Sequence, residues 1–406
     1  MKTRVNILFF FIFSFLYINV SAQDSINYKN PLWAFDYLIS SWKAQIPFCE
    51  IEYNIKKDSI YVSSEYRDFY GQALMTICTL NGNISYKDTI ANDFRDKISN
   101  LSILENENID IYDIKPQKIL IEEAQKKDIM MINEAHLYPQ HRAFMSSLLE
   151  DLYNVGYRHL FLEALSSDCT SEYPLKNMGI YVCEPTFANL IRKAILLGFT
   201  INSYDGYATS NRDSISAVNI CKKINDFNRT GKSIIYCGFE HNNEFMPHSV
   251  AFYLQKILNI DIMTVDQTLF SEAESSIFYE KILNNYCIDK PAVLQGGTWE
   301  NIKNRNAWGQ DYYIISPKTS YKYGYPIWVI DEASTWILND VMEYDCVEVF
   351  YDDEYEKLID PIPFSVKYHK KSNLTEKDKI LVPMNHEYKV IYSKIRDGSK
   401  EIIKII

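Results

Sequence analysis

Several common enzyme and metal-binding motifs are absent from this chain of 406 residues. There is no Gly-x-Ser-x-Gly, so a serine nucleophile on a sharp strand-to-helix turn is not expected. There is no Cys-x-x-Cys and no cysteine/histidine cluster with structural-zinc spacing, which argues against a zinc ribbon or a thioredoxin-like site. His141 follows His136 by five residues, so the His-Glu-x-x-His motif of zincins is missing too. Any reactive site must therefore be built from residues that lie far apart in the sequence.

The chain also lacks a long apolar run that would span a membrane, a length of about 18 residues or more. Lys2 and Arg4 precede a shorter apolar run over 7–20 that ends in Ser21 and Ala22. This is the pattern of a secretory signal peptide. No cysteine follows Ala22 to accept a lipid. We therefore predict an exported protein, periplasmic or extracellular, that is not a lipoprotein and has no integral membrane contact.

Positive charge is scarce relative to negative charge. Lys and Arg number 42 and Asp and Glu number 53, a formal charge of −11, and loss of Lys2 and Arg4 with the signal peptide makes it −13. This balance argues against nucleic acid or an anionic membrane surface as a partner and leaves a small-molecule ligand or substrate. The eight cysteines of an exported chain permit disulfides. We expect Cys169 and Cys183 to staple the irregular segment between them.

The sequence pattern divides the chain after the signal peptide at 1–22 into three regions. Short alternating segments with turn residues predict a β-rich region over 23–115 and another over 336–406. Between them, over 116–335, short apolar runs alternate with amphipathic helical segments. Repeated strand–helix units favour a mostly parallel sheet with helices on both faces. We therefore predict an α/β protein with small β-rich N- and C-terminal regions.

Ligands of parallel sheets bind beyond the carboxyl ends of the strands, so the residues that follow each expected strand are candidates for a site. Acid and imidazole groups stand at the end of each of the first four expected strands (128–133, 159–165, 199–205 and 232–238) or just after it. They are Glu134 and His136, Glu163, Asp205, and Glu240 with His241. Taken singly, each is equally compatible with a helix cap or a surface position. Their shared edge predicts one site.

Carboxylates and imidazoles at one rim support two kinds of chemistry. They ligate a divalent metal such as Zn, Fe or Mn, or they carry out metal-free acid–base hydrolysis with a histidine as base. If the site depends on a metal, the expected ligands are Glu134, His136, Glu163 and His241. Such closely spaced groups also shift each other's pKa values.

The segment over 133–165, NEAHLYPQHRAFMSSLLEDLYNVGYRHLFLEAL, resembles the opening motif of a known superfamily. That superfamily joins erythromycin esterases, the ChaN-like haem-binding lipoproteins and the TraB/Tiki proteins. Its first strand ends in Gly-Glu-x-His or Gly-Glu-x-x-His, and its next strand ends in Glu. The later segments NSYD, SNRDSISAVNICKKI and KSIIYCGFEHNNE are similar to the esterase branch, with its strand ending in Asp, its Arg-Asp pair opening a helix and its strand ending in Ala-His-Asn-x-His. The resemblance covers about 118–258.

The resemblance implies a central site of two glutamates and two histidines, supported by an aspartate and an arginine: Glu134, His136, Glu163, His241, Asp205 and Arg212. Independently of the family, a guanidinium beside carboxylates can keep one of them ionised or bind a developing oxyanion. A plain surface salt bridge is the alternative for Arg212. Asn133 stands where the family has glycine, and a side chain there could narrow the approach to the site.

Two functions follow from the resemblance. The first is an exported erythromycin esterase-like hydrolase of a small ester or amide, in which His136 or His241 activates a water and Arg212 stabilises the oxyanion. The second is a ChaN-like haem- or iron-binding protein for uptake without turnover. The branch holds haem through a tyrosine, and 31 tyrosines offer too many candidates. The short Glu134-to-His136 interval matches the ChaN-like branch and the Arg-Asp segment matches the esterase branch, so both functions stay open, as does a retained fold with a decayed site.

Two tryptophans and one further histidine complete the features of the sequence. Trp299 and Trp308, in the segment over 295–313, are expected either to form an aromatic loop over the site or to close the core. His141 is expected on a helix face.

Overall fold

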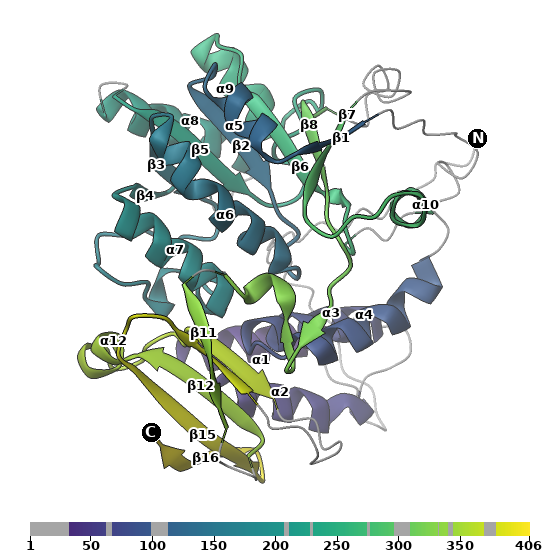
Figure 1. The fold of residues 1–406 in the computed structure, drawn as a ribbon, viewed down its shortest axis with the longest axis vertical. Helices are drawn as coiled ribbons and strands as arrows, with labels where there is room; N and C mark the ends of the chain where they lie inside the picture. The colour runs from purple at the N-terminus through teal and green to yellow at the C-terminus, as the bar shows by residue number, and fades with distance from the viewer. Residues whose placement is uncertain are drawn as a thin grey trace, which may run out of the picture.

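The computed structural model describes residues 32–61, 67–98, 113–206, 211–227, 230–273, 277–295, 309–331, 333–339, 344–368 and 379–406. The chain forms a central α/β part, a group of N-terminal helices and a set of C-terminal antiparallel strands (Figure 1). The expected signal peptide, 1–22, and both Trp299 and Trp308 lie outside the described residues. Within the described part of the chain, no helix is both long and apolar enough to cross a membrane.

An eight-stranded sheet forms the centre of the α/β part, in the order β1-β7-β8-β6-β2-β5-β3-β4. The strands are β1 (Asp113–Pro116), β2 (Ile129–Asn133), β3 (Tyr157–Leu162), β4 (Thr200–Ser203), β5 (Lys232–Cys237), β6 (Met263–Phe270), β7 (Ala292–Gln295) and β8 (Tyr312–Ile315). The strands from β8 to β4 in this order pair in parallel, and β7 alone runs antiparallel to both of its neighbours. The predicted α/β class with a mostly parallel sheet is confirmed.

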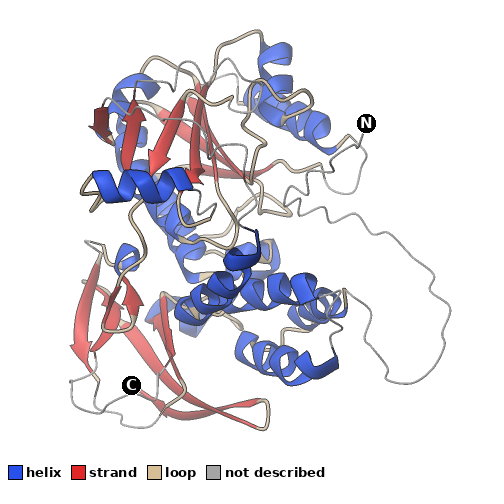
Figure 2. Cartoon of the chain, turned by 90° about the vertical axis from the view of Figure 1, so that its right-hand side faces the viewer, coloured by secondary structure: helices blue, strands red, loops and turns tan. Residues whose placement is uncertain are grey.

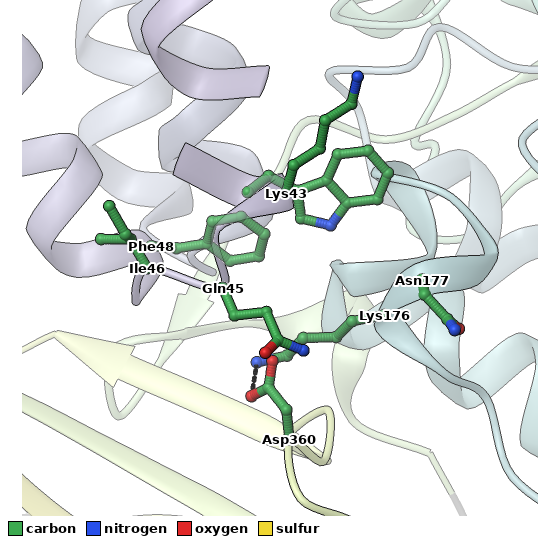
Figure 3. A pocket seen from close by; sticks show the side chains of 8 residues that line it. Lys43, Gln45, Ile46, Phe48, Lys176, Asn177 and Asp360 are labelled. Carbon is green, nitrogen blue, oxygen red and sulfur yellow. Dashed lines mark hydrogen bonds and ion pairs between the residues drawn. The ribbon is translucent and has the colours of Figure 1, made fainter. Parts of the chain in front are cut away.

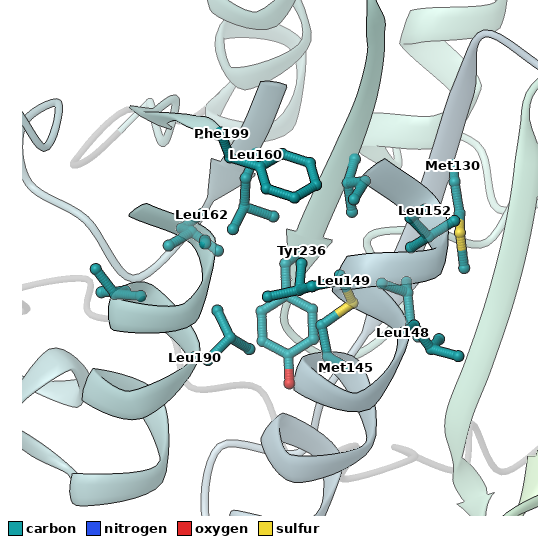
Figure 4. Packing of buried hydrophobic residues seen from close by; sticks show 14 of the residues in the cluster. Met130, Met145, Leu148, Leu149, Leu152, Leu160, Leu162, Leu190, Phe199 and Tyr236 are labelled. Carbon is teal, nitrogen blue, oxygen red and sulfur yellow. The ribbon is translucent and has the colours of Figure 1, made fainter. Parts of the chain in front are cut away.

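Helices cover both faces of this sheet, which explains the apolar run in β2. Met130 and Ile132 pack in one cluster with α5 (Lys118–Ala124), α6 (Gln140–Asn154) and α7 (Pro185–Leu197), around Tyr236 (Figure 4). Ile129 and Met131 point to the other face, into a cluster with α8 (Arg212–Asp226) and α9 (Val250–Leu258). A further helix, α10 (Ile277–Asn285), packs beside β6. A strand that is buried on both faces needs apolar residues at every position.

Local sequence signals set the ends of the helices that flank the site. Glu184 caps α7, accepting hydrogen bonds from the backbone N–H groups of Thr186 and Phe187, and Pro185 stands at the first helical position. Proline there loses no hydrogen bond, because the first N–H groups of a helix have no partner within it. Gly198 ends α7 in the left-handed conformation, with φ of 92°.

The described part of the N-terminal region, 32–61 and 67–98, is helical, so the prediction of a β-rich region over 23–115 was wrong. Its helices are α1 (Trp33–Lys43), α2 (Phe48–Lys57), α3 (Arg67–Leu80) and α4 (Ile84–Ile98). Ile51 and Ile55 are both fully buried, four residues apart, which places them on one face of α2. The alternating polar residues between them suggested a strand, but burial against α1 and α3 selects the helical period.

The C-terminal region consists mainly of antiparallel strands, as predicted. A four-stranded sheet has the order β13-β12-β15-β16, and β11 pairs with β14 (Figure 2). Its elements are β11 (Ser334–Leu338), β12 (Cys346–Tyr351), α12 (Asp352–Lys357), β13 (Ser365–Tyr368), β14 (Lys379–Pro383), β15 (Tyr388–Arg396) and β16 (Ser399–Ile405). Arg192 of α7 binds Glu354 of α12 through two hydrogen bonds of 2.7 and 2.6 Å, which fixes this region against the α/β part. A bidentate guanidinium–carboxylate pair sets both distance and orientation.

Candidate functional site

The loop after β2 carries a buried carboxylate held in one orientation. Glu134 is 2% exposed, and Arg142 of α6 donates to both of its oxygens, from Nε at 2.8 Å and from Nη2 at 2.9 Å. The Tyr236 hydroxyl of β5 donates to Oε2 at 2.8 Å. Burial opposes ionisation of Glu134, but Arg142 and His136 more than compensate and hold its pKa well below the usual range. Glu134 is therefore a fixed anion.

This anion orients the imidazole of His136. Nδ1 of His136 lies 2.7 Å from Oε1 of Glu134, and the ring stacks on Tyr181 with centroids 4.6 Å apart. Its other nitrogen, Nε2, faces Gly238 at the end of β5: a Cβ added to Gly238 would lie 2.9 Å from Nε2 and 3.1 Å from Oε2 of Glu163. Because Gly238 has no side chain, the His136 imidazole and the Glu163 carboxylate both pack closely against it.

Glu163, which follows β3, is the second buried carboxylate. Its Oε1 accepts a hydrogen bond of 2.5 Å from Nη2 of Arg212, and its Oε2 accepts one from the backbone N–H of Gly238. Burial again opposes ionisation, but the charges of His241, Arg212 and His136 lower the pKa of Glu163 to about 2. Glu163 therefore carries its charge at all physiological pH values.

A second imidazole approaches Glu163 from the other side. Nε2 of His241 lies 3.5 Å from Oε1 of Glu163, and its Nδ1 lies 2.9 Å from Oδ2 of Asp213. Burial disfavours the charged form of His241, yet Glu163 and Asp213 outweigh it and raise the pKa of His241 to about 9. His241 is thus an imidazolium at neutral pH. The two imidazoles are arranged alike. Nδ1 of each contacts a carboxylate, and Nε2 of each faces Glu163.

Arg212, at the start of α8, joins two carboxylates. Nε and Nη2 donate to the two oxygens of Asp205 at 2.7 and 2.6 Å, while Nη2 also binds Glu163. Burial raises the pKa of Asp205, and Arg212 opposes that rise. The Arg212 side chain remains 32% exposed and lines a shallow hollow with Glu163, Tyr204 and His241. The structure therefore brings together all six of the predicted residues: Glu134, His136, Glu163, Asp205, Arg212 and His241.

Sequence reasoning missed the residues that hold these six in place. Arg142 is fully buried between Glu134 and Glu184, and its Nη2 also donates to the backbone oxygen of His136 at 2.8 Å. Asp213 is the aspartate of the Arg-Asp pair noted in the sequence. That pair was the signal that could have identified Asp213 as a site residue. Nothing in the sequence indicated Tyr181, which reaches His136 from the irregular insertion before α7.

His141 lies in α6, in agreement with its expected place on a helix, and Asn133 does not take the place that was expected of its side chain. His141 is fully buried in α6, and its Nδ1 accepts a hydrogen bond of 3.0 Å from the N–H of Ala135, between Glu134 and His136. Burial lowers the pKa of His141 to about 3, so the ring stays neutral and holds this loop. The Asn133 amide turns toward β6, where it donates to Asp266 at 2.8 Å. It therefore does not narrow the approach to the site.

The expected disulfide is not formed. All eight cysteines are free thiols. The Cys169 thiol contacts the backbone oxygen of Ser171, whereas the Cys183 thiol contacts that of Gly179. Hydrogen bonds and packing hold the insertion instead, including the donation from the Ser166 N–H to the Met178 oxygen at 2.7 Å.

The four proposed metal ligands do not fit a metal site as they are arranged here. Among the described residues, no group of three or more His, Cys, Asp and Glu side chains has the geometry to hold a metal ion. Two of the carboxylate groups already have strong partners, since Glu134 binds Arg142 and Glu163 binds Arg212. The donor types suit a divalent cation, but their present contacts are to guanidinium groups and to each other.

Comparison with known proteins gives no relative that informs function. No family model matches the chain, and no curated protein matches it. Among solved structures, the type III effector HopBA1 is similar at a TM-score of 0.28 and 12% identity, over 41% of this chain and 90% of that chain. The signal recognition particle receptor FtsY from Elizabethkingia anophelis, in complex with GDP, is similar at 0.24 and 12%, over 65% and 80%. Similarities this low do not indicate a shared function, so the function is inferred from the site itself.

Proposed function

We propose that the chain is an exported hydrolase, similar to the erythromycin esterases, that cleaves a small ester or amide by metal-free acid–base chemistry. One observation supports this most: two imidazoles, each oriented by its own carboxylate, face the same buried glutamate at the carboxyl edge of a parallel sheet. Perturbed titratable groups gathered in one place are typical of catalytic sites.

The two histidines take different roles because their surroundings differ. His241 has a pKa raised to about 9, so at neutral pH it is a proton donor and a cation rather than a base. This leaves His136 as the general base. Its Nδ1 lies 2.7 Å from Glu134, which orients the ring so that Nε2 can accept a proton from water.

The reaction then runs as follows. Water attacks the carbonyl carbon as Nε2 of His136 takes its proton, and the oxyanion that forms lies near the cations His241 and Arg212. Collapse of the intermediate breaks the bond to the leaving alcohol or amine, which receives a proton from His241. The proton held by His136 returns His241 to its charged form through solvent. Glu163 positions both cations and keeps His241 protonated.

The haem- or iron-binding alternative has less support in the described residues. The hollow at Glu163, Arg212 and His241 is open to solvent and encloses no volume that a water-sized sphere can enter. Sites for drug-sized ligands and cofactors occupy about 300–1,000 Å³, which makes this hollow small for a porphyrin.

The test uses the mature chain without its first 22 residues. Hydrolysis of p-nitrophenyl acetate and p-nitrophenyl butyrate is measured for the wild type, His136→Asn and Glu163→Gln, with His248→Asn as a matched histidine control. His248 binds Tyr253 at 2.7 Å and touches none of the six site residues. We expect both site variants to lose at least a hundredfold in kcat/KM, an expectation of about 10²–10⁴ for a general base, and the control to keep its activity.

A second substitution separates catalysis from general damage. Gly238→Ala places a methyl group between His136 and Glu163 and is expected to abolish turnover while the fold persists, as judged by circular dichroism. Equal rates in the wild type and His136→Asn would refute the hydrolase. A Soret band in the purified protein that is lost in the same variant would instead identify the haem-binding alternative.

A further inference from the structure

A cavity of about 280 Å³ lies apart from the Glu/His site, where α1, α2, the short helix over 176–178 and the segment after α12 meet (Figure 3). Trp42 and Phe48 give it aromatic walls. Gln45, Lys176 and Asp360 give it polar groups. It shares no lining residue with the hollow at Glu163. Its volume is close to the lower end of the range of about 300–1,000 Å³ for small-molecule sites.

Gln45 has a backbone conformation that is uncommon for a residue with a side chain. It follows α1 by two residues in the left-handed region, with φ of 59°, and its N–H binds the Trp42 oxygen at 2.9 Å. Glycine is usual at this position because a Cβ is strained there. Replacing Gln45 by glycine would therefore remove its amide from the cavity lining and relieve the strain. Figure 3 shows the Gln45 amide beside the Lys176 and Asp360 side chains.

The charges of the lining favour a neutral ligand. Lys176 and Asp360 form an ion pair with each other in the cavity lining, so their charges neutralise each other. Together with the Gln45 amide they offer an ammonium, a carboxylate and an amide within a short distance, which suits a ligand with several hydroxyl groups. The aromatic walls suit a flat apolar face on the same ligand. A sugar ring combines an apolar C–H face with a rim of hydroxyls.

We propose that this cavity binds a neutral monosaccharide unit, with the apolar ring face against Trp42 and Phe48 and the hydroxyls on Gln45, Lys176 and Asp360. The Trp42 indole lies against the Cys183 thiol of the insertion, which holds the aromatic wall in position. The site joins residues of the N-terminal helices, the α/β part and the C-terminal region. It does not depend on the hydrolase function.

The experiment titrates D-glucose, D-galactose, D-mannose and N-acetyl-D-glucosamine into the mature full-length chain by isothermal titration calorimetry. We expect at least one to bind, and we expect Gln45→Gly and Asp360→Asn each to weaken that binding at least tenfold. Gln45→Gly should also raise Tm, because it relieves the left-handed strain. Loss of binding together with a gain in stability rules out unfolding as the cause.

Asn259→Gly is the matched control. Asn259 ends α9 in the same left-handed region, with φ of 50°, and does not line the cavity. Its substitution should raise Tm and leave sugar binding unchanged. His136→Asn should also bind sugar normally, which separates this site from the hydrolase. The proposal is overturned if none of the four sugars binds, or if Gln45→Gly and Asp360→Asn both bind as tightly as the wild type.

Discussion

The charge of His241 is the feature of the site that can be tested most directly. Its pKa is raised from 6.5 to about 9, against a burial penalty, by Glu163 and by Asp213 at 2.9 Å. At about 1.36 kcal/mol per pKa unit, this rise corresponds to about 3 kcal/mol of stabilisation of the folded state. Because the folded pKa exceeds the unfolded one, this contribution is complete below about pH 6.5 and is lost as the pH rises through about 9.

Replacing Asp213 with Asn removes a charge but keeps a hydrogen-bonding group of the same shape. An opposite charge at this distance shifts a pKa by about 1–3 units, so the pKa of His241 should fall by about that amount in Asp213→Asn. At pH 7 the free energy of unfolding should then fall by about 1–3 kcal/mol. The difference between variant and wild type should shrink at pH 10, where His241 is neutral in both.

Two measurements check this. NMR titration of the histidine rings between pH 5 and pH 10 gives the pKa of His241, and urea unfolding at pH 6, 8 and 10 gives the stability. Asp168→Asn is the control, because Asp168 pairs with Lys223 at the surface and is 44% exposed, and such pairs contribute about 0–1 kcal/mol. Titration of His241 between pH 6 and 7 in the wild type, or an equal pKa in Asp213→Asn, would refute the reasoning.

Three further predictions follow from the buried parts of the structure. Arg142→Met should cost about 3–5 kcal/mol in urea unfolding, because it leaves Glu134 buried without its charge partner, and adding Glu134→Gln should recover part of that loss; additive losses would contradict the pairing. His141→Leu should remove the acceptor for the Ala135 N–H, at about 1–3 kcal/mol, and speed its hydrogen exchange, whereas His141→Asn should retain an acceptor and slow exchange; equal exchange in both would contradict that role. Thiol titration should find eight free groups in denaturant, with Cys287 reacting first in the native protein because it alone is exposed, and a smaller total would show that disulfides form.

The sequence predicted the α/β part well because its strands and helices have strong and different periods. Each expected strand over 128–133, 159–165, 199–205 and 232–238 overlaps an observed one. The N-terminal region failed for a physical reason. In α2, polar residues alternate with Ile51 and the apolar residues that follow it. This spacing of the apolar residues fits one face of a strand and also one face of a helix. Packing against α1 and α3 decided between them, and local sequence does not contain that information.

The convergence of the site followed from a rule about sheets, whereas its internal contacts did not. Residues at the carboxyl ends of parallel strands meet at one edge, which was enough to bring Glu134, Glu163 and His241 together. Which carboxylate orients which imidazole depends on side-chain directions after folding. For that reason Asp213, rather than Asp205, holds His241, and Arg212 binds both Asp205 and Glu163.

The contact between Arg142 and Glu134 is better explained by orientation than by stability. Both side chains are almost fully buried, and a buried ion pair is often no more stabilising than apolar residues of the same size, because desolvation offsets the attraction. What an apolar pair could not supply is the carboxylate oxygen that fixes Nδ1 of His136, or the donor that binds the His136 backbone oxygen. The buried charge of Arg142 in α6 therefore opposes folding, and its effect is to fix the orientation of the His136 imidazole.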